Sequence, residues 1–281
     1  MTVKMSLNDM NSDKENVYTI LEGITSVSAC IKSMDEGVPS RDIAEILVDS
    51  SKVSGGGDRF RRRLAHHNGK SAEYGFAVRE CSGDELATLT SGTTHGGIAA
   101  RVGQRKIKPL DAANISPHGF YMLFDGIEDP YSFGYSLRSL YAAGADGVII
   151  PGGVLISADS TISRSSAGAY ELLPVYSADG GAVDAVGMFR AAGYRILCSG
   201  IRDSVSYLDA GLSRPLVIVM GGEKRGISSS LAAVCDGCVR IGYGRQFMGS
   251  LSTACPAAMP ATCVPCAEAC PPWLTLQSLS A

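Results

Sequence analysis

The sequence predicts an α/β protein whose second half forms a parallel β-sheet with helices on both faces. Short runs of apolar residues recur at 120–124, 147–150, 194–198 and 215–220, and segments of helical length separate several of them. Strands that are apolar along their whole length are typical of parallel sheets, because helices bury both faces of such a strand. The ligand of a sheet of this kind is expected at the carboxyl ends of its strands.

The second half alternates between strand and helix. In chain order we predict a strand over 120–124, a helix over 135–143 that Gly144 ends, a strand over 147–150, a helix over 182–192, strands over 194–198 and 215–220, and a helix from about residue 227. The tail after Cys255 differs, because its segments 255–261 and 270–272 hold four prolines: Pro256, Pro260, Pro271 and Pro272. Proline inside a helix costs about 3 kcal/mol, so we predict no regular helix in this atypical tail, 255–281.

The first half is predicted with less regular structure. The polar segment 1–14 is interpreted as a flexible tail. Apolar residues recur at helical spacing from Val17 to Val27 and predict an amphipathic helix that ends near Met34. The segment Ile43–Asp49 is interpreted as a helix end that runs into a short strand. The predicted organisation is a tail over 1–14, a first domain over 15–108, a linker over 109–118 and a second domain over 119–281.

Composition excludes several classes of protein. The 281 residues are 45% hydrophobic and 19% charged, which is typical of a globular chain, and the formal charge is −3. That charge argues against a generally basic nucleic-acid binder but allows a local basic patch. No apolar run reaches the roughly 18 residues of a membrane span, and the N-terminus lacks the apolar stretch of a secretory signal. We therefore expect a cytoplasmic protein without membrane contact.

Two basic clusters lie in the first half. One contains Arg59, Arg61, Arg62 and Arg63, and the other contains Arg101, Arg105 and Lys106. Both suit contacts to RNA phosphates. Solvated protein faces have the same composition, so both interpretations stay open at this point.

Six of the nine cysteines lie in the last fifth of the chain: Cys235, Cys238, Cys255, Cys263, Cys266 and Cys270. Two pairs, Cys235/Cys238 and Cys263/Cys266, have the two-residue gap of a zinc site. A small zinc-binding interaction module over 235–270 is therefore one hypothesis. We nevertheless predict no metal site, because the first pair falls in a segment where a strand is expected.

Three glycine-bearing segments contain the candidate functional residues. The first runs from Asp125 to Gly134 and is followed by Arg138, which we place on the first or second turn of the next helix. Acidic residues, a proline turn and an arginine at a sheet edge are consistent with an anion or ribose site, or with an ordinary turn beside a solvated arginine. The second segment, 217–227, has paired glycines after a buried strand, which allow a ligand to approach the backbone. The third segment, 241–254, adds main-chain groups and a serine hydroxyl.

Together these segments resemble the SpoU (TrmH-like) family of RNA 2′-O-methyltransferases, in the trefoil-knot (SPOUT) superfamily. The first motif of the family corresponds to Asp129, Pro130, Ser132, Gly134 and Arg138, the second to Gly221, Gly222, Glu223 and Gly226, and the third to Ile241 and Ser250-Leu251-Ser252. The segments 94–97 and 165–169 extend the likeness. Ser132 and Ser252 replace the asparagines of the family motifs. Serine has one donor where an amide has two, so these departures put activity in question but not the fold.

The resemblance implies a C-terminal trefoil-knot methyltransferase domain and a small N-terminal α/β substrate domain like a ribosomal protein. It implies a homodimer and S-adenosylmethionine, held by Met220, Gly221, Ile241, Tyr243 and Leu251. The implied reaction is methyl transfer to a ribose 2′-hydroxyl of structured RNA, with ribosomal RNA favoured over transfer RNA. The implied catalytic residues are Arg138, Glu223, Ser250 and Ser132. A non-catalytic RNA-binding relative that keeps the knot is the alternative.

Overall fold

The computed structural model describes residues 18–91, 95–152, 158–222, 224–246 and 251–264. The chain divides into two compact units. The first contains residues up to Val27 together with Arg41–Arg105, and the second contains Ser28–Ser40 together with Lys106 onward. No helix among the described residues is both long and apolar enough to cross a membrane.

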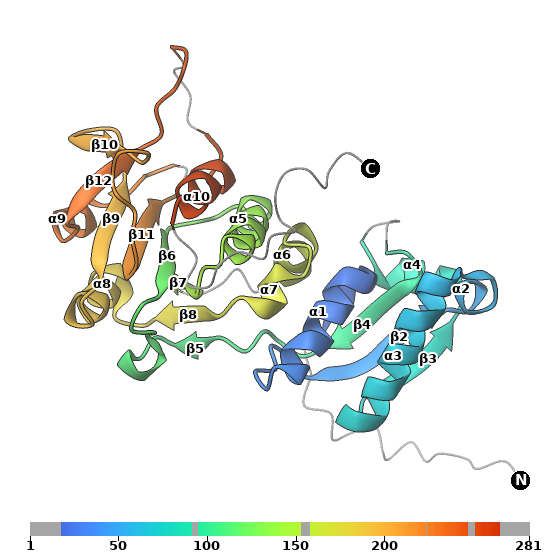
Figure 1. Ribbon diagram of the computed structural model, residues 1–281. Coiled ribbons are helices and arrows are strands. Elements are labelled where there is room, and N and C mark those ends of the chain that lie inside the picture. The colour runs from blue at the N-terminus through green and yellow to red at the C-terminus, as the bar shows by residue number, and fades with distance from the viewer. Residues whose placement is uncertain (1–17, 92–94, 153–157, 223, 247–250, 265–281) are drawn as a thin grey trace, which may run out of the picture. The chain divides into compact units, whose positions relative to one another are not determined.

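A four-stranded sheet forms the centre of the first unit. Its order is β1 (Thr19–Glu22), β4 (Ile98–Val102), β2 (Ile43–Asp49) and β3 (Ala77–Cys81). β4 runs antiparallel to both of its neighbours, whereas β2 and β3 are parallel. The helices in this part of the chain are α1 (Gly23–Asp35), α2 (Ser50–Gly55), α3 (Asp58–Tyr74) and α4 (Gly83–Leu89) (Figure 1).

Two sequence predictions for this half are wrong. The helix predicted from Val17 begins only at Gly23, because the preceding residues form β1 and Leu21 pairs with Ala100 of β4. The segment Ile43–Asp49 is a strand along its whole length and contains no helix end. In both cases pairing with the distant strand β4 decides the local structure, and helical spacing alone cannot reveal that partner.

The second unit contains an eight-stranded sheet in which every pair of neighbours is parallel. Its order is β10 (Ser204–Ser206), β12 (Gly237–Arg240), β9 (Arg195–Ser199), β11 (Leu216–Gly221), β6 (Phe120–Asp125), β7 (Gly147–Pro151), β8 (Val175–Ala178) and β5 (Lys108–Pro109). The predicted parallel α/β sheet is therefore confirmed.

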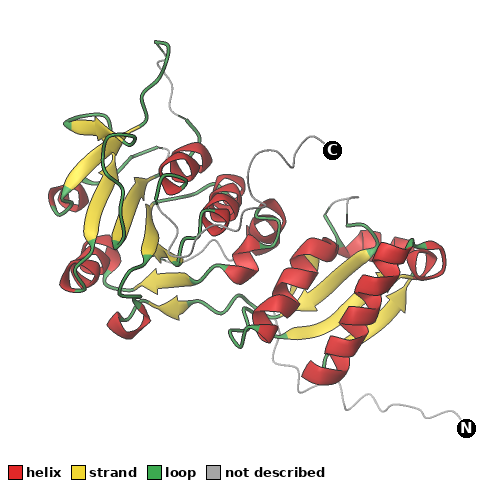
Figure 2. Ribbon diagram, in the orientation of Figure 1, coloured by secondary structure: helices red, strands yellow, loops and turns green. Residues whose placement is uncertain are grey.

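Helices cover both faces of this sheet (Figure 2). One layer contains α5 (Pro130–Ala142), α6 (Asp159–Ser165), α7 (Ala169–Leu172) and α10 (Ala254–Ala261), and the other contains α8 (Gly181–Ala191) and α9 (Ser229–Ala233). Successive residues of β6 pack against opposite helix layers. Met122 packs toward α5, while Tyr121 and Leu123 pack toward α8. This double burial explains why the strands are apolar throughout. A single 3₁₀ turn, Ala112–Asn114, precedes β6.

The prediction that the atypical tail forms no regular helix is wrong for its first part. α10 includes both Pro256 and Pro260. Pro256 lies in the first turn, where a helix lacks N–H partners in any case. Ala257 and Ala261 are fully buried in the same core cluster as α5. This packing stabilises a short helix despite an interior proline, as tertiary contacts commonly override propensity. Residues 265–281 lie outside the described part of the chain.

Candidate functional site

The first and second glycine-bearing segments leave the sheet from neighbouring strands. β6 and β11 pair in parallel, and their last residues, Asp125 and Gly221, are Cα partners. The main-chain N–H of Gly222 donates to the carbonyl of Asp125 at 2.7 Å, which extends the pairing by one residue beyond the strands. The two loops therefore lie side by side at the carboxyl edge of the sheet, where ligands of parallel sheets bind.

Gly221 and Gly222 of the second segment are both required by close backbone contacts, Gly222 against the first loop and Gly221 within its own loop. A Cβ atom on Gly222 would lie 2.1 Å from the carbonyl oxygen of Gly126. A Cβ atom on Gly221 would lie 2.3 Å from the carbonyl carbon of Gly226. The sequence interpretation assigned this space to a ligand. At these two positions the protein's own backbone occupies it, so the glycines serve close packing of the edge.

α5 begins at the first segment, five residues earlier than predicted. Asp129 is its N-cap, and the carboxylate accepts a hydrogen bond from the main-chain N–H of Ser132 at 2.7 Å. The hydrogen bond to Ser132 lowers the pKa of Asp129 below its ordinary value. Pro130 follows at the first helical position, where its fixed φ suits the helix and its missing N–H costs nothing. The Asp-Pro pair of the first motif is therefore a helix start.

Gly134 lets a second helix approach α5 closely. A Cβ atom at this position would lie 1.9 Å from Ser165 Oγ and 3.0 Å from the carbonyl oxygen of Ile162, both on α6. Ser165 itself donates to the carbonyl of Thr161 at 2.8 Å. The glycine of the first motif and the serine of the segment 165–169 are thus two sides of one helix contact.

Arg138 lies in the third turn of α5, not in the first or second as predicted. Eight residues separate it from Pro130, which corresponds to about 12 Å along the helix. The side chain is exposed, and among the described residues no hydrogen bond or ion pair engages its guanidinium. Arg138 therefore presents an uncompensated positive charge on the outer face of the helix layer.

The described part of the third segment contacts the first segment. Ser252 Oγ lies 3.3 Å from Ser132 Oγ, within hydrogen-bond distance, and Ser132 is buried. The two positions at which the sequence departs from the family motifs therefore contact each other across 120 residues of chain. Glu223 and Ser250, both predicted as catalytic, lie outside the described residues.

The residues predicted to bind the cofactor differ in exposure. Met220 is buried at the end of β11, and Gly221 follows at the edge. Ile241 follows β12 and is half-buried, Tyr243 is 43% exposed, and Leu251 is half-buried before α10. β9 separates β11 from β12, and all three strands are parallel. Met220, Gly221 and Ile241 therefore lie at the same sheet edge on two strands that are not direct neighbours.

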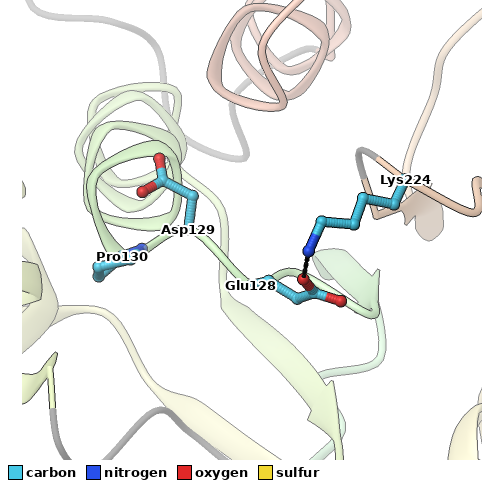
Figure 3. A pocket seen from close by; sticks show the side chains of 4 residues that line it. All are labelled: Glu128, Asp129, Pro130 and Lys224. Carbon is cyan, nitrogen blue, oxygen red and sulfur yellow. Dashed lines mark hydrogen bonds and ion pairs between the residues drawn. The ribbon is translucent and has the colours of Figure 1, made fainter.

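A hollow of about 280 Å³ opens between the first two loops, lined by Glu128, Asp129, Pro130 and Lys224 (Figure 3). The ammonium group of Lys224 and the carboxylate of Glu128 form an ion pair across it, as the dashed line in Figure 3 shows. This pair lowers the pKa of Glu128. Neither residue was predicted from the sequence. Their opposite charges in loops that follow two strands were the available signal, but it becomes useful only once β6 and β11 are known to be neighbours.

The predicted RNA-binding residues have different surroundings. On α3, Arg59 and Arg62 are exposed, and with Arg63 they fall on one side of the helix. Arg61 is also exposed but lies 3.8 Å from Asp58. In the second cluster Arg101 forms an ion pair with Glu45 at 2.9 Å, Arg105 is half-buried and Lys106 is exposed. The α3 arginines are therefore the more accessible of the two groups.

Of the two cysteine pairs, only Cys235/Cys238 lies wholly within the described residues. Cys238 Sγ lies 3.1 Å from Cys198 Sγ of the neighbouring strand. Burial raises the pKa of Cys238 to about 12. Within the described ranges no three His, Cys, Asp or Glu side chains are grouped to hold a metal ion. Cys266 and Cys270 lie outside those ranges.

Comparison with known proteins agrees with this geometry. Residues 119–255 match the model of the SpoU rRNA Methylase family. A putative TrmH family tRNA/rRNA methyltransferase of Staphylococcus saprophyticus is 30% identical over 156 residues, which are 54% of this chain and 62% of the relative. The chain thus spans less than two thirds of that relative. The 23S rRNA (guanosine-2'-O-)-methyltransferase RlmB of Shewanella oneidensis is 28% identical over 228 residues, 79% of this chain and 87% of the relative.

Solved structures share the fold. A crystal structure of an RNA 2'-O ribose methyltransferase superposes with a TM-score of 0.70 at 21% identity and covers 88% of this chain and 87% of its own. An AdoMet-bound rRNA methyltransferase from Sinorhizobium meliloti gives 0.68 at 23% identity, with 87% and 85% covered. The parallel sheet, the three motif segments at its carboxyl edge and the family model coincide. Residues 119–255 of this chain therefore form a domain that matches the SpoU rRNA Methylase family.

Proposed function

We propose that the protein transfers the methyl group of S-adenosylmethionine to a ribose 2′-hydroxyl of structured RNA, with ribosomal RNA favoured over transfer RNA. The observation that carries the proposal is the exposed guanidinium of Arg138, which no described residue pairs with, on the helix that starts at the motif edge. The RlmB relative acts on 23S rRNA, as its name states, which supports the ribosomal preference.

The residues at the edge fit the proposed cofactor. Methyl groups added to Gly242 or Gly244 would meet no atom within 4 Å, so the backbone of the third segment borders open space. Met220 and Gly221 supply main-chain groups at the end of β11, and the exposed ring of Tyr243 adds apolar surface. S-adenosylmethionine supplies an electrophilic methyl group when bound. In our proposal Met220, Gly221, Ile241, Tyr243 and Leu251 hold it.

Arg138 is proposed to position the substrate. A guanidinium has a pKa above about 12 and is a poor base, but it binds phosphate well. Holding the phosphate next to the target ribose fixes the hydroxyl in line with the methyl group, and such placement contributes several kcal/mol. Ser132 is proposed to order the edge through its contact with Ser252. Glu223 and Ser250 are proposed to orient Arg138 and the ribose.

The roles of the two domains, the homodimer and the cellular location are also proposed by analogy with the family. The exposed arginines of α3 suit RNA phosphates, so residues 15–108 are proposed as the substrate domain, like a ribosomal protein. Arg101, Arg105 and Lys106 are proposed to extend this contact. The domain 119–281, joined through the linker 109–118, is proposed to be trefoil-knotted and to form a homodimer with the active site at the interface. We propose that the protein works in the cytoplasm.

The test is transfer of labelled methyl groups from the cofactor to purified ribosomal and transfer RNA. We expect label on RNA with the wild type and a loss of about a hundredfold or more with Arg138→Ala, because positioning is lost. Arg190→Ala is the matched control, because Arg190 lies on α8, on the opposite face of the sheet, and pairs with Asp236. No label on either RNA from a protein that binds the cofactor would overturn the proposal.

The second candidate is a non-catalytic RNA-binding relative. Ser132 and Ser252 favour it, because both replace amide side chains and engage each other. This candidate predicts cofactor and RNA binding without transfer. It also predicts that Ser132→Asn combined with Ser252→Asn gains methyl transfer that the wild type lacks.

A further inference from the structure

The exposed face of α5 carries two tyrosines that the proposed chemistry does not use. Tyr131, Tyr135 and Arg138 are four and three residues apart, so they follow one line along the helix. At about 100° per residue they lie within a sector of about 60°. Tyr131 is 48% exposed and Tyr135 is 51% exposed. We call these three side chains the Tyr-Arg strip.

The strip connects the motif edge with Arg138. Tyr131 directly follows Pro130, which lines the hollow at the carboxyl edge of the sheet. Tyr135 lies one turn further along α5, and Arg138 lies almost one turn beyond it. A strand of nucleic acid that runs along this face from Arg138 to the edge therefore passes over both phenol rings.

The composition of the helix fits RNA rather than the protein core. Phe133, Leu137 and Leu140 already bury the opposite face of α5, so the two exposed rings do not serve the core cluster. α5 contains no acidic residue, and Arg138 is its one charged side chain. Unpaired RNA bases stack on exposed aromatic rings, and arginine binds phosphate, so the strip offers both halves of single-strand recognition.

We propose that the Tyr-Arg strip binds the RNA beside the target nucleotide, with Tyr131 and Tyr135 stacking on unpaired bases while Arg138 contacts a phosphate. The inference rests on the proposed function and narrows it. The substrate is a loop or another single-stranded element whose bases are splayed next to the modified ribose, and it is not a continuous duplex.

The test uses the full chain and a short fluorescein-labelled single-stranded oligoribonucleotide of mixed sequence, with its duplex as the second probe. We expect Tyr131→Ala and Tyr135→Ala each to weaken single-strand binding at least about fivefold, because each loses a stacking ring. Tyr131→Phe and Tyr135→Phe keep the ring and should keep the affinity. Tyr141→Ala is the matched control, because this exposed tyrosine of α5 lies about 120° around the helix from Tyr135.

Salt dependence separates stacking from charge. The log of the affinity falls as the log of the salt concentration rises. Arg138→Ala should make this fall less steep by about 0.7, the value for one phosphate of a single strand. The tyrosine variants should lower the affinity at every salt concentration without changing that slope. Unchanged affinity in both alanine variants, or an equal loss for single strand and duplex, overturns the inference.

Three further outcomes separate this inference from its alternatives. If sedimentation shows that the alanine variants lose self-association while RNA affinity stays unchanged, the strip binds a second copy of the chain and the inference is overturned. If the wild type transfers no methyl group but single-strand affinity still depends on the tyrosine rings, the proposed function fails and the inference stands. If the wild type methylates RNA and the alanine variants bind it as tightly, the inference alone fails.

Discussion

The loops after β6 and β11 and the segment after β12 leave the same edge of one sheet, yet they are built differently. In the first two loops the backbone packs so closely that a methyl group on Gly221 or Gly222 would overlap other backbone atoms. The third passes Gly242 and Gly244, where a methyl group would meet nothing within 4 Å. The packed loops fix the shape of the edge, and the open segment provides the surface that a ligand can contact.

Glycine substitutions test this contrast most directly. Gly222→Ala should lower the free energy of unfolding by about 3 kcal/mol, because the new methyl group overlaps the Gly126 carbonyl. Gly242→Ala should change it by less than about 0.5 kcal/mol, because its site is open. Urea denaturation of both variants measures the difference. Equal effects would show that the two loops are not distinguished by packing.

The helix cap of the packed side should give the next largest effect. Asp129→Ala removes the carboxylate that accepts the Ser132 N–H and should cost about 1 kcal/mol. Because the hydrogen bond lowers the pKa of Asp129 in the folded state, the stabilisation is complete above the ordinary value of 3.8 and is lost as the pH falls through the folded pKa. The difference between wild type and variant should therefore shrink in acid, as unfolding curves at several pH values would show. A constant difference would exclude the cap as its source.

The contact between Ser132 and Ser252 joins the packed and open parts. A double-mutant cycle of Ser132→Ala and Ser252→Ala should give a coupling energy of about 0.5 kcal/mol, typical of a neutral hydrogen bond. Thermal or urea unfolding of the four proteins provides it. Strict additivity would mean that the third segment is held independently of α5.

The ion pair across the hollow should contribute least. Glu128 and Lys224 are 60% and 77% exposed, so water and salt screen their attraction. We expect Lys224→Ala to leave the unfolding midpoint unchanged at physiological salt. A clear drop in that midpoint would instead make this pair part of what closes the packed loops.

The central strands β6, β7, β9 and β11 of the second unit were predicted because burial on both faces leaves an apolar run, as in β11. The start of α5 was also encoded, since Asp129 and Pro130 are N-cap and first-turn residues, but the prediction began the helix at Tyr135 and so misplaced Arg138 by a turn. β1 and α10 could not be predicted locally. Each depends on a partner distant in sequence, β4 for the strand and α5 for the helix.

In the candidate site, too, some features were predictable from sequence motifs and others depend on contacts between distant segments. Family motifs identified Arg138 and the paired glycines, whereas the reason for the glycines appears only when Gly126 is seen against Gly222. The Glu128–Lys224 pair required knowledge that β6 and β11 are neighbours. Spacing within the sequence also could not reveal that the thiol of Cys238 contacts Cys198 on the adjacent strand.

The contact between Ser132 and Ser252 has a consequence for how such sequences diverge. Two side chains within 3.3 Å of each other form one unit of variation, because the fit of any residue at either position depends on its partner. A single asparagine at either position would face a serine and not an amide. We therefore expect the effects of substitutions at these two positions to depend on each other.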